Sequence, residues 1–187
     1  MADFNKLSET VVSELGEVFS RMDDTSVRPL LEAIKKAPRI FLFGLGREGL
    51  STKSFAMRLM HLGKESHWMF DDTTPAIQKG DLVIISCGCG NNAIMGHVME
   101  EARKHGAILA HMSAMPSNPF ADMADIVTMM PATSFHSSGD HLVPTKQLMG
   151  NQFEQGLMLL FDIIVMMLQE ELGITAEEME TRHRNVE

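Results

Sequence analysis

The chain has 187 residues, of which 44% are hydrophobic and 22% are charged, and its formal net charge at pH 7 is -9. This composition is that of a globular protein with an ordinary core and excludes a disordered chain. The acidic balance leaves no basic stripe to neutralise backbone phosphates, so we expect no nucleic-acid partner.

The first residues, Met1–Lys6, lack the basic and then apolar pattern of a signal peptide, and we therefore expect a cytoplasmic protein. The longest apolar run, Gly156–Leu168, is interrupted by Asp162 and is shorter than the roughly 18 residues of a membrane span. We expect no membrane partner and interpret this run as a helix buried in the core or between subunits.

Hydrophobic periodicity predicts an α/β chain that begins with two helices. In chain order we expect helices at 4–19 and 24–36, a strand at 39–43, a helix ending near 63, strands at 66–70 and 82–85, a helix at 93–105, a strand at 107–112, a short helix at 118–124 and a strand at 126–130. This alternation predicts a parallel sheet covered by helices on both faces.

The remainder of the chain begins with an aperiodic segment, 131–149, whose length is typical of a functional or contact-making loop. Two further helices follow, one at 150–172 and one that starts at the capping box Thr175–Glu178. With no internal repeat and no linker, residues 1–187 are interpreted as one domain.

Two glycine-containing turns join a strand to a helix. They are Gly44–Gly49, with the sequence GLGREG, and Ser86–Asn92, with the sequence SCGCGNN. Such turns place backbone N–H groups and the positive end of a helix dipole at one point. In a parallel sheet both turns lie at the carboxyl edge, so they predict an anion site in one crevice.

Two other functions fit parts of this pattern. The Gly-x-Gly-x-x-Gly spacing, with Asp71 after the second strand, is that of a dinucleotide fingerprint and keeps a nicotinamide oxidoreductase as an alternative. Against it, two helices precede the first strand, and a nicotinamide site does not need the second glycine turn.

Cys87 and Cys89 raise the possibility of a metal site, but their spacing matches no zinc motif. We interpret them as small residues of a tight turn and expect no metal or organic cofactor.

Several separated stretches carry a resemblance to a known family. In chain order they are GLGR at 44–47, FAMRLMHLG at 55–63, TTPAI at 73–77 with GDL at 80–82, MGNQFEQ at 149–155 and RHRNVE at 182–187. On these stretches the chain resembles the sugar isomerase (SIS) domain proteins and, among them, the 6-phospho-3-hexuloisomerases. The resemblance implies a flavodoxin-like, five-stranded parallel sheet flanked by helices, and a homotetramer with sites built across subunit boundaries.

The resemblance also implies a reaction, the conversion of D-arabino-3-hexulose 6-phosphate into fructose 6-phosphate through an enediolate. This chemistry needs a base and donors that stabilise the enediolate. By resemblance, Glu154 is the base and His183 is the acid or proton shuttle, within the chain or toward a neighbouring subunit. From the residues alone, Glu154 is a polar residue in the first turns of a helix, and His183 is a solvated residue of a charged tail.

The same resemblance assigns the two glycine turns to substrate and phosphate binding. The implied residues are Gly46, Arg47, Glu48, Cys87, Gly88, Cys89, Gly90, Asn91 and Asn92. Arg47 is either an anion or hydroxyl contact or a surface ion-pair partner.

The second turn departs from the family sequence, which is approximately Ser-Gly-Ser-Gly-Glu-Thr, because Cys87 and Cys89 replace both serines and Asn92 replaces the threonine. Thiols are weaker donors than hydroxyls, and Glu48, where the family usually has serine, repels phosphate if it points into the crevice. We therefore expect weakened phosphate binding or a different ligand.

The alternative function is a sugar or sugar-phosphate binding protein that is non-catalytic or altered in specificity. Replacement donors are sought in the segment after the fifth strand, at Ser137, Ser138, His141 and Lys146.

Overall fold

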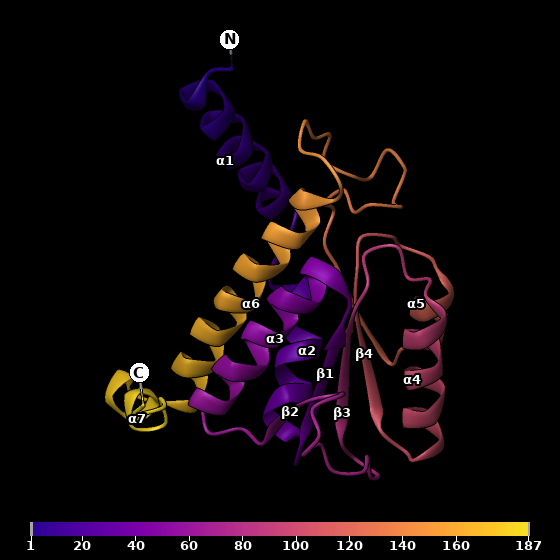
Figure 1. Cartoon of the computed structure of the whole chain (residues 1–187), viewed down its shortest axis with the longest axis vertical. Helices are drawn as coiled ribbons and strands as arrows, with labels where there is room; N and C mark the ends of the chain where they lie inside the picture. Colours follow the sequence, from indigo (N-terminus) through magenta and orange to yellow (C-terminus); the bar gives the residue numbers. More distant parts are fainter. Residues whose placement is uncertain (1, 187) are drawn as a thin grey trace.

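A five-stranded parallel sheet forms the centre of the molecule (Figure 1). The computed structural model describes residues 2–186. The sheet order is β2-β1-β3-β4-β5, and every neighbouring pair is parallel. The elements are α1 (Phe4–Ser20), α2 (Asp24–Lys36), β1 (Ile40–Gly44), α3 (Gly46–His61), β2 (Ser66–Trp68), β3 (Leu82–Ser86), α4 (Ala93–Lys104), β4 (Ile108–Ser113), α5 (Pro119–Met123), β5 (Ile126–Met129), α6 (Asn151–Leu172) and α7 (Ala176–Thr181).

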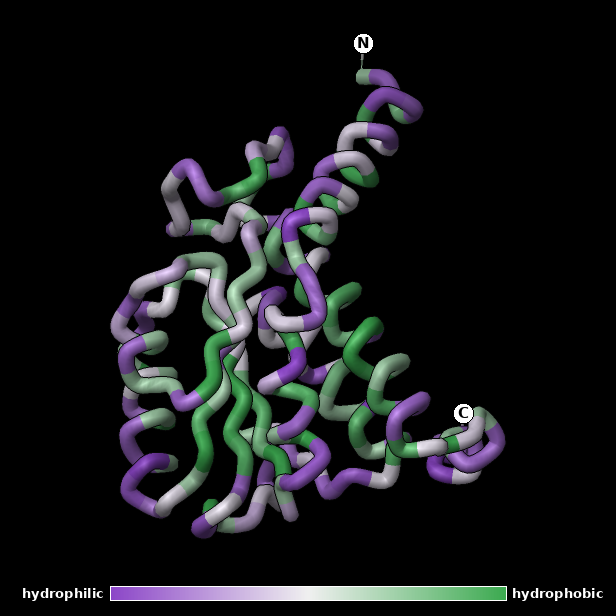
Figure 2. Tube along the Cα trace, turned by 180° about the vertical axis from the view of Figure 1, so that it is seen from behind, coloured by the Kyte–Doolittle hydropathy of each residue, from purple (hydrophilic) through white to green (hydrophobic). Residues whose placement is uncertain are grey.

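Helices cover both faces of the sheet, as the alternation of strands and helices predicts. Successive strand residues point to opposite faces, so Ile40 and Leu42 of β1 join the core shared with α2, α3 and α6. Phe41 and Phe43 of the same strand join the core shared with α4 and α5. Figure 2 shows the hydrophobic residues concentrated along the strands and polar residues along the outer side of α4. The predicted fold class is therefore confirmed.

The edge strand β2 is shorter than the sequence predicts. It pairs with β1 only from Ser66 to Trp68, opposite Ile40 to Leu42. The chain then turns, and the amide of Asp71 donates to the carbonyl oxygen of Trp68. The remaining elements lie within about two residues of their predicted bounds, which is the ordinary uncertainty of a helix or strand end.

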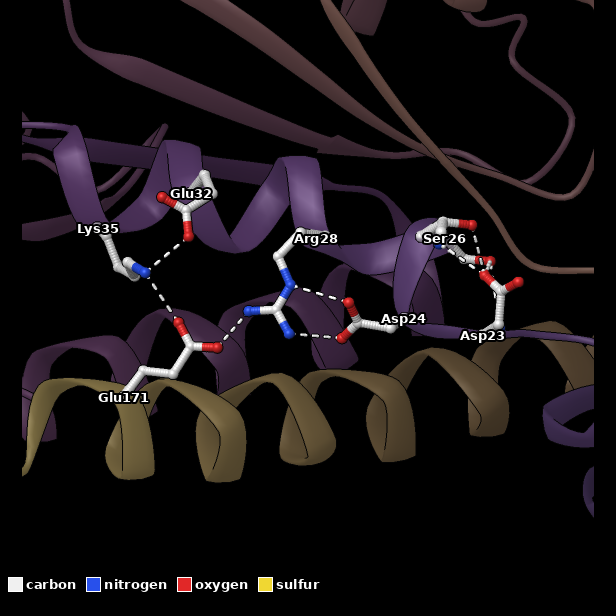
Figure 3. A network of polar contacts seen from close by, with 8 residues as sticks. Asp23, Asp24, Ser26, Arg28, Glu32, Lys35 and Glu171 are labelled. Atoms are coloured by element: carbon white, nitrogen blue, oxygen red, sulfur yellow. Dashed lines mark hydrogen bonds and ion pairs between the residues drawn. The ribbon is translucent and has the colours of Figure 1, made fainter.

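Helix α6 packs against α3 through its apolar face, where the rings of Phe55 and Phe161 stack with a centroid distance of 4.2 Å. At the other end of α6, Glu171 accepts hydrogen bonds from Arg28 and Lys35 of α2 (Figure 3). Surface ion pairs of this kind contribute little individually, so the buried apolar face does most to hold α6 in place. Among residues 2–186, no helix is long and apolar enough to cross a membrane.

Helix α1 extends away from the body of the molecule (Figure 1). Its side chains Phe4, Leu7 and Val12 are exposed, and Leu159, Ile163 and Met166 form an exposed apolar row on α6. Exposed apolar rows on neighbouring helices are typical of association surfaces.

Candidate functional site

The two glycine turns lie side by side at the carboxyl edge of the sheet. Gly44, the last residue of β1, is in register with Ser86, the last residue of β3. From these neighbouring ends the chain enters α3 and α4. The side chain of Glu48, in the first turn of α3, crosses between the turns and accepts a hydrogen bond from the Gly88 amide at 3.1 Å. The structure therefore brings the two predicted turns into direct contact.

Two glycines of the second turn are required by close packing. A Cβ atom at Gly88 would lie 2.4 Å from the Cβ atom of Ser134. At Gly90, φ is +64°, and a Cβ atom would lie 1.9 Å from the side-chain oxygen of Asn118. Larger residues cannot enter either position without displacing these neighbours. The turn is thus fixed between the 131–149 segment and the start of α5.

A cavity of about 300 Å³, the Glu48 cavity, opens beside the second turn. Its lining residues are Leu45, Glu48, Cys87, Cys89, Asn91, Asn92, Met95, Ser134, Phe135 and His136. The Sγ atoms of Cys87 and Cys89 lie 3.7 Å apart, and both thiols are free. Burial, with smaller effects of the neighbouring Cys89 and Glu48, raises the pKa of the Cys87 thiol to about 12. At neutral pH Cys87 is therefore a neutral, weak donor.

Asn92 caps α4, a role that the family resemblance did not indicate. Its side-chain oxygen accepts hydrogen bonds from the amides of Ile94 at 3.0 Å and Met95 at 3.2 Å. Asparagine is among the favoured residues at this position because it satisfies the first amides of a helix. The capping bonds leave this oxygen engaged with the backbone rather than with a ligand.

Glu48 has an unusual electrostatic environment. Burial raises the pKa of its carboxyl to about 7, the hydrogen bond from the Gly88 amide opposes this rise, and the charge of Glu154 adds to it. Both the apolar surroundings and a second negative charge disfavour an ionised carboxylate. Near neutral pH, Glu48 is therefore present in both its protonated and its ionised form.

Glu154 lies in the first turn of α6 beside a second cavity of about 480 Å³, the Glu154 cavity. Its lining residues are Leu15, Arg47, Leu50, Ser51, Glu154, Gln155, Met158 and Leu159. The Arg47 Nε atom donates to Oε2 of Glu154 at 2.6 Å, and the Ser51 hydroxyl donates to the Glu154 carbonyl oxygen at 3.0 Å. These two bonds fix both the side chain and the backbone of Glu154 to α3.

Arg47 and Glu48 are consecutive residues that serve the two cavities. Arg47 lines the Glu154 cavity, whereas Glu48 lines the Glu48 cavity. The charge of Glu154 contributes to the raised pKa of the Glu48 carboxyl. The first turn of α3 therefore contributes a charged side chain to each cavity.

His183 lies elsewhere in the chain. It follows α7, beyond the C-terminal end of α6, and its ring stacks on His61 with a centroid distance of 5.1 Å. Glu154 is at the opposite end of α6, and the intervening helix spans about 27 Å at the usual rise per residue. Within one chain the structure does not bring His183 to Glu154, so a role for His183 at this site stays a prediction that requires a second subunit.

Sequence reasoning missed Ser134 as an individual site residue. This side chain is only 3% exposed and lines the Glu48 cavity, and within residues 2–186 its hydroxyl has no hydrogen-bond partner. The donors expected from the same segment are placed differently. The Ser137 hydroxyl bonds to the backbone of Ser134, and the ring of His141 contacts the Ala114 carbonyl oxygen. The sequence carries no signal for this residue, because the burial of a side chain in an aperiodic segment cannot be predicted from sequence.

The alternative sites have little support in the geometry. Asp71, the expected ribose ligand of a nicotinamide site, forms an ion pair with Lys53 at 3.2 Å and lines neither cavity. In the described part of the chain, no group of three or more His, Cys, Asp or Glu side chains is arranged to hold a metal ion.

Comparison with known proteins agrees with the fold. The family model for the SIS domain matches residues 33–149. The chain is 36% identical to a 3-hexulose-6-phosphate isomerase of Mycobacterium gastri, over 98% of this chain and 90% of that protein. It is 35% identical to a protein of the same name from Bacillus subtilis, over 95% of each chain.

A solved structure is similar over nearly its whole length. It is a Methanococcus jannaschii protein whose crystal structure was reported to infer a molecular function of 3-hexulose-6-phosphate isomerase. The TM-score is 0.80 and the identity is 25%, with 97% of this chain and 99% of that chain covered. The protein described here therefore belongs to the SIS-domain family and is similar, within it, to proteins named 3-hexulose-6-phosphate isomerase.

Proposed function

We propose that the protein is a sugar-phosphate isomerase that converts 3-hexulose 6-phosphate into fructose 6-phosphate. One structural observation carries the proposal. The carboxylate of Glu154 lines a cavity, is held by Arg47 at 2.6 Å, and lies next to a glycine turn suited to an anion. The names of the near full-length relatives support the same substrate class.

In this proposal Glu154 is the general base. It removes the proton from C2 of the hexulose, the electron pair forms the C2–C3 double bond, and the C3 carbonyl oxygen becomes an enediolate oxygen. Glu154 then returns the proton to C3, and the C2 hydroxyl proton passes to the C3 oxygen. This gives the C2 ketone and the C3 hydroxyl, so the atoms and charges balance. Arg47 orients the carboxylate and is placed to stabilise negative charge on the enediolate oxygens.

The proposal places the phosphate group in the Glu48 cavity, where the Ser134 hydroxyl is a donor and the Gly88 amide becomes one once Glu48 releases it. Gly88 belongs to the second glycine turn, and Ser134 packs against it. The Ser134 hydroxyl compensates in part for the loss of the two serine hydroxyl donors that the cysteines replace. An anion at this position also benefits from the N-terminal end of α4.

We also propose that the protein assembles into a homo-oligomer, with the homotetramer of the sequence prediction as the expected form. The exposed row of Leu159, Ile163 and Met166 on α6 supports this proposal, as do the exposed apolar residues of α1. In such an assembly His183 of a second copy could reach the site as the acid. Light scattering of the purified chain tests the oligomer, and a monomer at micromolar concentration would contradict it.

The function is tested by incubating the protein with 3-hexulose 6-phosphate and measuring fructose 6-phosphate. We expect enzyme-dependent formation of product that needs no added metal or cofactor. Product formation no faster than in buffer would contradict isomerase activity. If fructose 6-phosphate still raised the melting temperature in that case, the alternative of a non-catalytic sugar-phosphate binding protein would be favoured.

A further inference from the structure

The carboxylate of Glu48 accepts a hydrogen bond from a backbone amide of the second glycine turn. A bound anion would otherwise use this amide. The Gly88 amide donates to Oε2 of Glu48 at 3.1 Å. Other amides nearby are also engaged, because Gly90 donates to the Cys87 carbonyl oxygen and the first amides of α4 donate to Asn92. The turn thus already holds an anionic group that belongs to the chain itself.

The charged groups around Glu48 do not attract a second anion strongly. From α6, Glu154 contributes a negative charge, and Arg47 on α3 is held by that same carboxylate. From the second turn, Cys87 is a neutral thiol. From the 131–149 segment, His136 lines the cavity and is the one ionisable base among its lining residues. A phosphate dianion entering beside an ionised Glu48 therefore meets like-charge repulsion with little compensation.

We propose that Glu48 is a specificity-determining residue of the anion site, because its carboxylate must be neutralised or displaced from Gly88 before a phosphate group can bind there. The inference rests on the proposed function only in taking the ligand to be a phosphate monoester. It goes beyond that function by making phosphate recognition conditional on the state of one side chain.

The buried hydroxyl of Ser134 supports a ligand position beside Glu48. Ser134 is only 3% exposed and lines the same cavity, and its hydroxyl has no hydrogen-bond partner among residues 2–186. Buried hydroxyls in proteins are normally hydrogen-bonded, so an unpartnered one beside an amide that binds a carboxylate points to a polar ligand. Displacement of the Glu48 carboxylate by phosphate would give both Gly88 and Ser134 an acceptor.

The inference predicts a pH dependence with a definite sign. Glu48 has a pKa of about 7, so it is mostly protonated one unit below this value and mostly ionised one unit above it. Protonation removes the Glu48 charge from the site, and the protonated fraction, which is the one competent for phosphate binding, falls about tenfold over that range. The phosphate monoester itself loses its second proton near pH 6, and this change is common to every protein variant.

The test is calorimetric titration of the full-length protein with fructose 6-phosphate at about pH 6 and pH 8, compared with Glu48→Gln and Glu48→Ser. We expect wild-type affinity to fall about tenfold more between the two pH values than the affinity of either variant. Glu48→Gln keeps an oxygen that can accept from the Gly88 amide, whereas Glu48→Ser opens the cavity. The same pH dependence of affinity in both variants therefore excludes a packing effect. Glu100→Gln, an exposed change on α4, is the control for lost charge and should behave as wild type.

The same pH dependence in wild type and in both Glu48 variants would overturn the inference. So would the absence of measurable binding to every variant at both pH values. The isomerase assay is separate, because a protein that shows the predicted pH-dependent binding but no turnover would refute the proposed function and leave the role of Glu48 intact.

Discussion

Arg47 and Glu154 are 107 positions apart in the sequence, yet the Arg47 Nε atom lies 2.6 Å from Oε2 of Glu154. This ion pair joins the first turn of α3 to the first turn of α6, and the hydrogen bond from Ser51 to the Glu154 carbonyl oxygen reinforces it. The side chain of Glu154 is 15% exposed, whereas that of Arg47 is 60% exposed. A largely buried carboxylate held by an arginine at a cavity is the arrangement that the isomerase proposal requires.

Replacing Glu154 by glutamine should lower kcat by about 10²- to 10⁴-fold, because a general base contributes roughly that factor. The KM should change by only a few-fold, since glutamine retains the shape and one acceptor oxygen. Steady-state kinetics with 3-hexulose 6-phosphate measure both values. Glu170→Gln, an exposed change near the other end of α6, is the matched control. A Glu154→Gln enzyme with wild-type kcat would rule out Glu154 as the base.

Removing the Ser134 hydroxyl should weaken substrate binding without changing the chemical step. Ser134→Ala loses one donor to the phosphate group, which corresponds to an increase in KM of about five- to tenfold for a typical hydrogen bond. Ser138→Ala, an exposed change in the same segment, should leave KM unaltered. Equal KM values for wild type and Ser134→Ala would show that Ser134 does not contact the substrate.

The two thiols should differ in reactivity. Burial raises the pKa of Cys87 to about 12, whereas Cys89 is partly exposed at the same cavity. Since the thiolate is the nucleophile, iodoacetamide at neutral pH should modify Cys89 well before Cys87. Tandem mass spectrometry of the labelled protein assigns the modified residue, and complete unfolding should make both residues react. Labelling of Cys87 first in the native protein would disprove this description of the turn.

The free energy of unfolding should carry a signature of Glu48. Its pKa is about 7 in the folded protein and 4.5 in the reference state, so the folded state binds more protons between these values. The contribution of Glu48 to stability is therefore fully present below about pH 4.5 and is lost as pH rises through 7. Glu48→Gln lacks this dependence.

Relative to Glu48→Gln, the wild-type protein should thus lose on the order of 3 kcal/mol between pH 4.5 and pH 8. Urea unfolding at several pH values measures the difference, and Glu100→Gln controls for the loss of one surface charge. A stability difference between wild type and Glu48→Gln that does not vary with pH would show that the Glu48 carboxyl is not perturbed.

The fold could be predicted in large part because each of its features has a local cause. Strand β3 has five buried residues, the first four of them apolar, and the glycine turn after it marks a strand-to-helix connection. The capping box at Thr175 also forms as expected. Edge strand β2 was predicted too long, because the chain turns after Trp68, with the Asp71 amide bonded to the Trp68 carbonyl oxygen, although β1 continues to Gly44.

The site could be predicted only where the chain itself brings residues together. The capping role of Asn92 follows from its place just before a helix and was available from the sequence. The ion pair between Arg47 and Glu154 and the hydrogen bond between Glu48 and Gly88 arise from packing of distant segments. Neither periodicity nor motif spacing indicates which of two consecutive side chains faces which cavity.

The most direct test of the account is exchange of the C3 proton of fructose 6-phosphate with deuterium in D₂O, followed by proton NMR. In the proposed reaction, run backwards, Glu154 removes this proton to form the enediolate, and solvent deuterium can replace it. We predict loss of the C3 proton signal with the wild-type protein and retention of the signal with Glu154→Gln. A C3 signal that decays no faster with the wild-type protein than in buffer, or equally fast with both proteins, would contradict the assignment of Glu154 as the base of an isomerase.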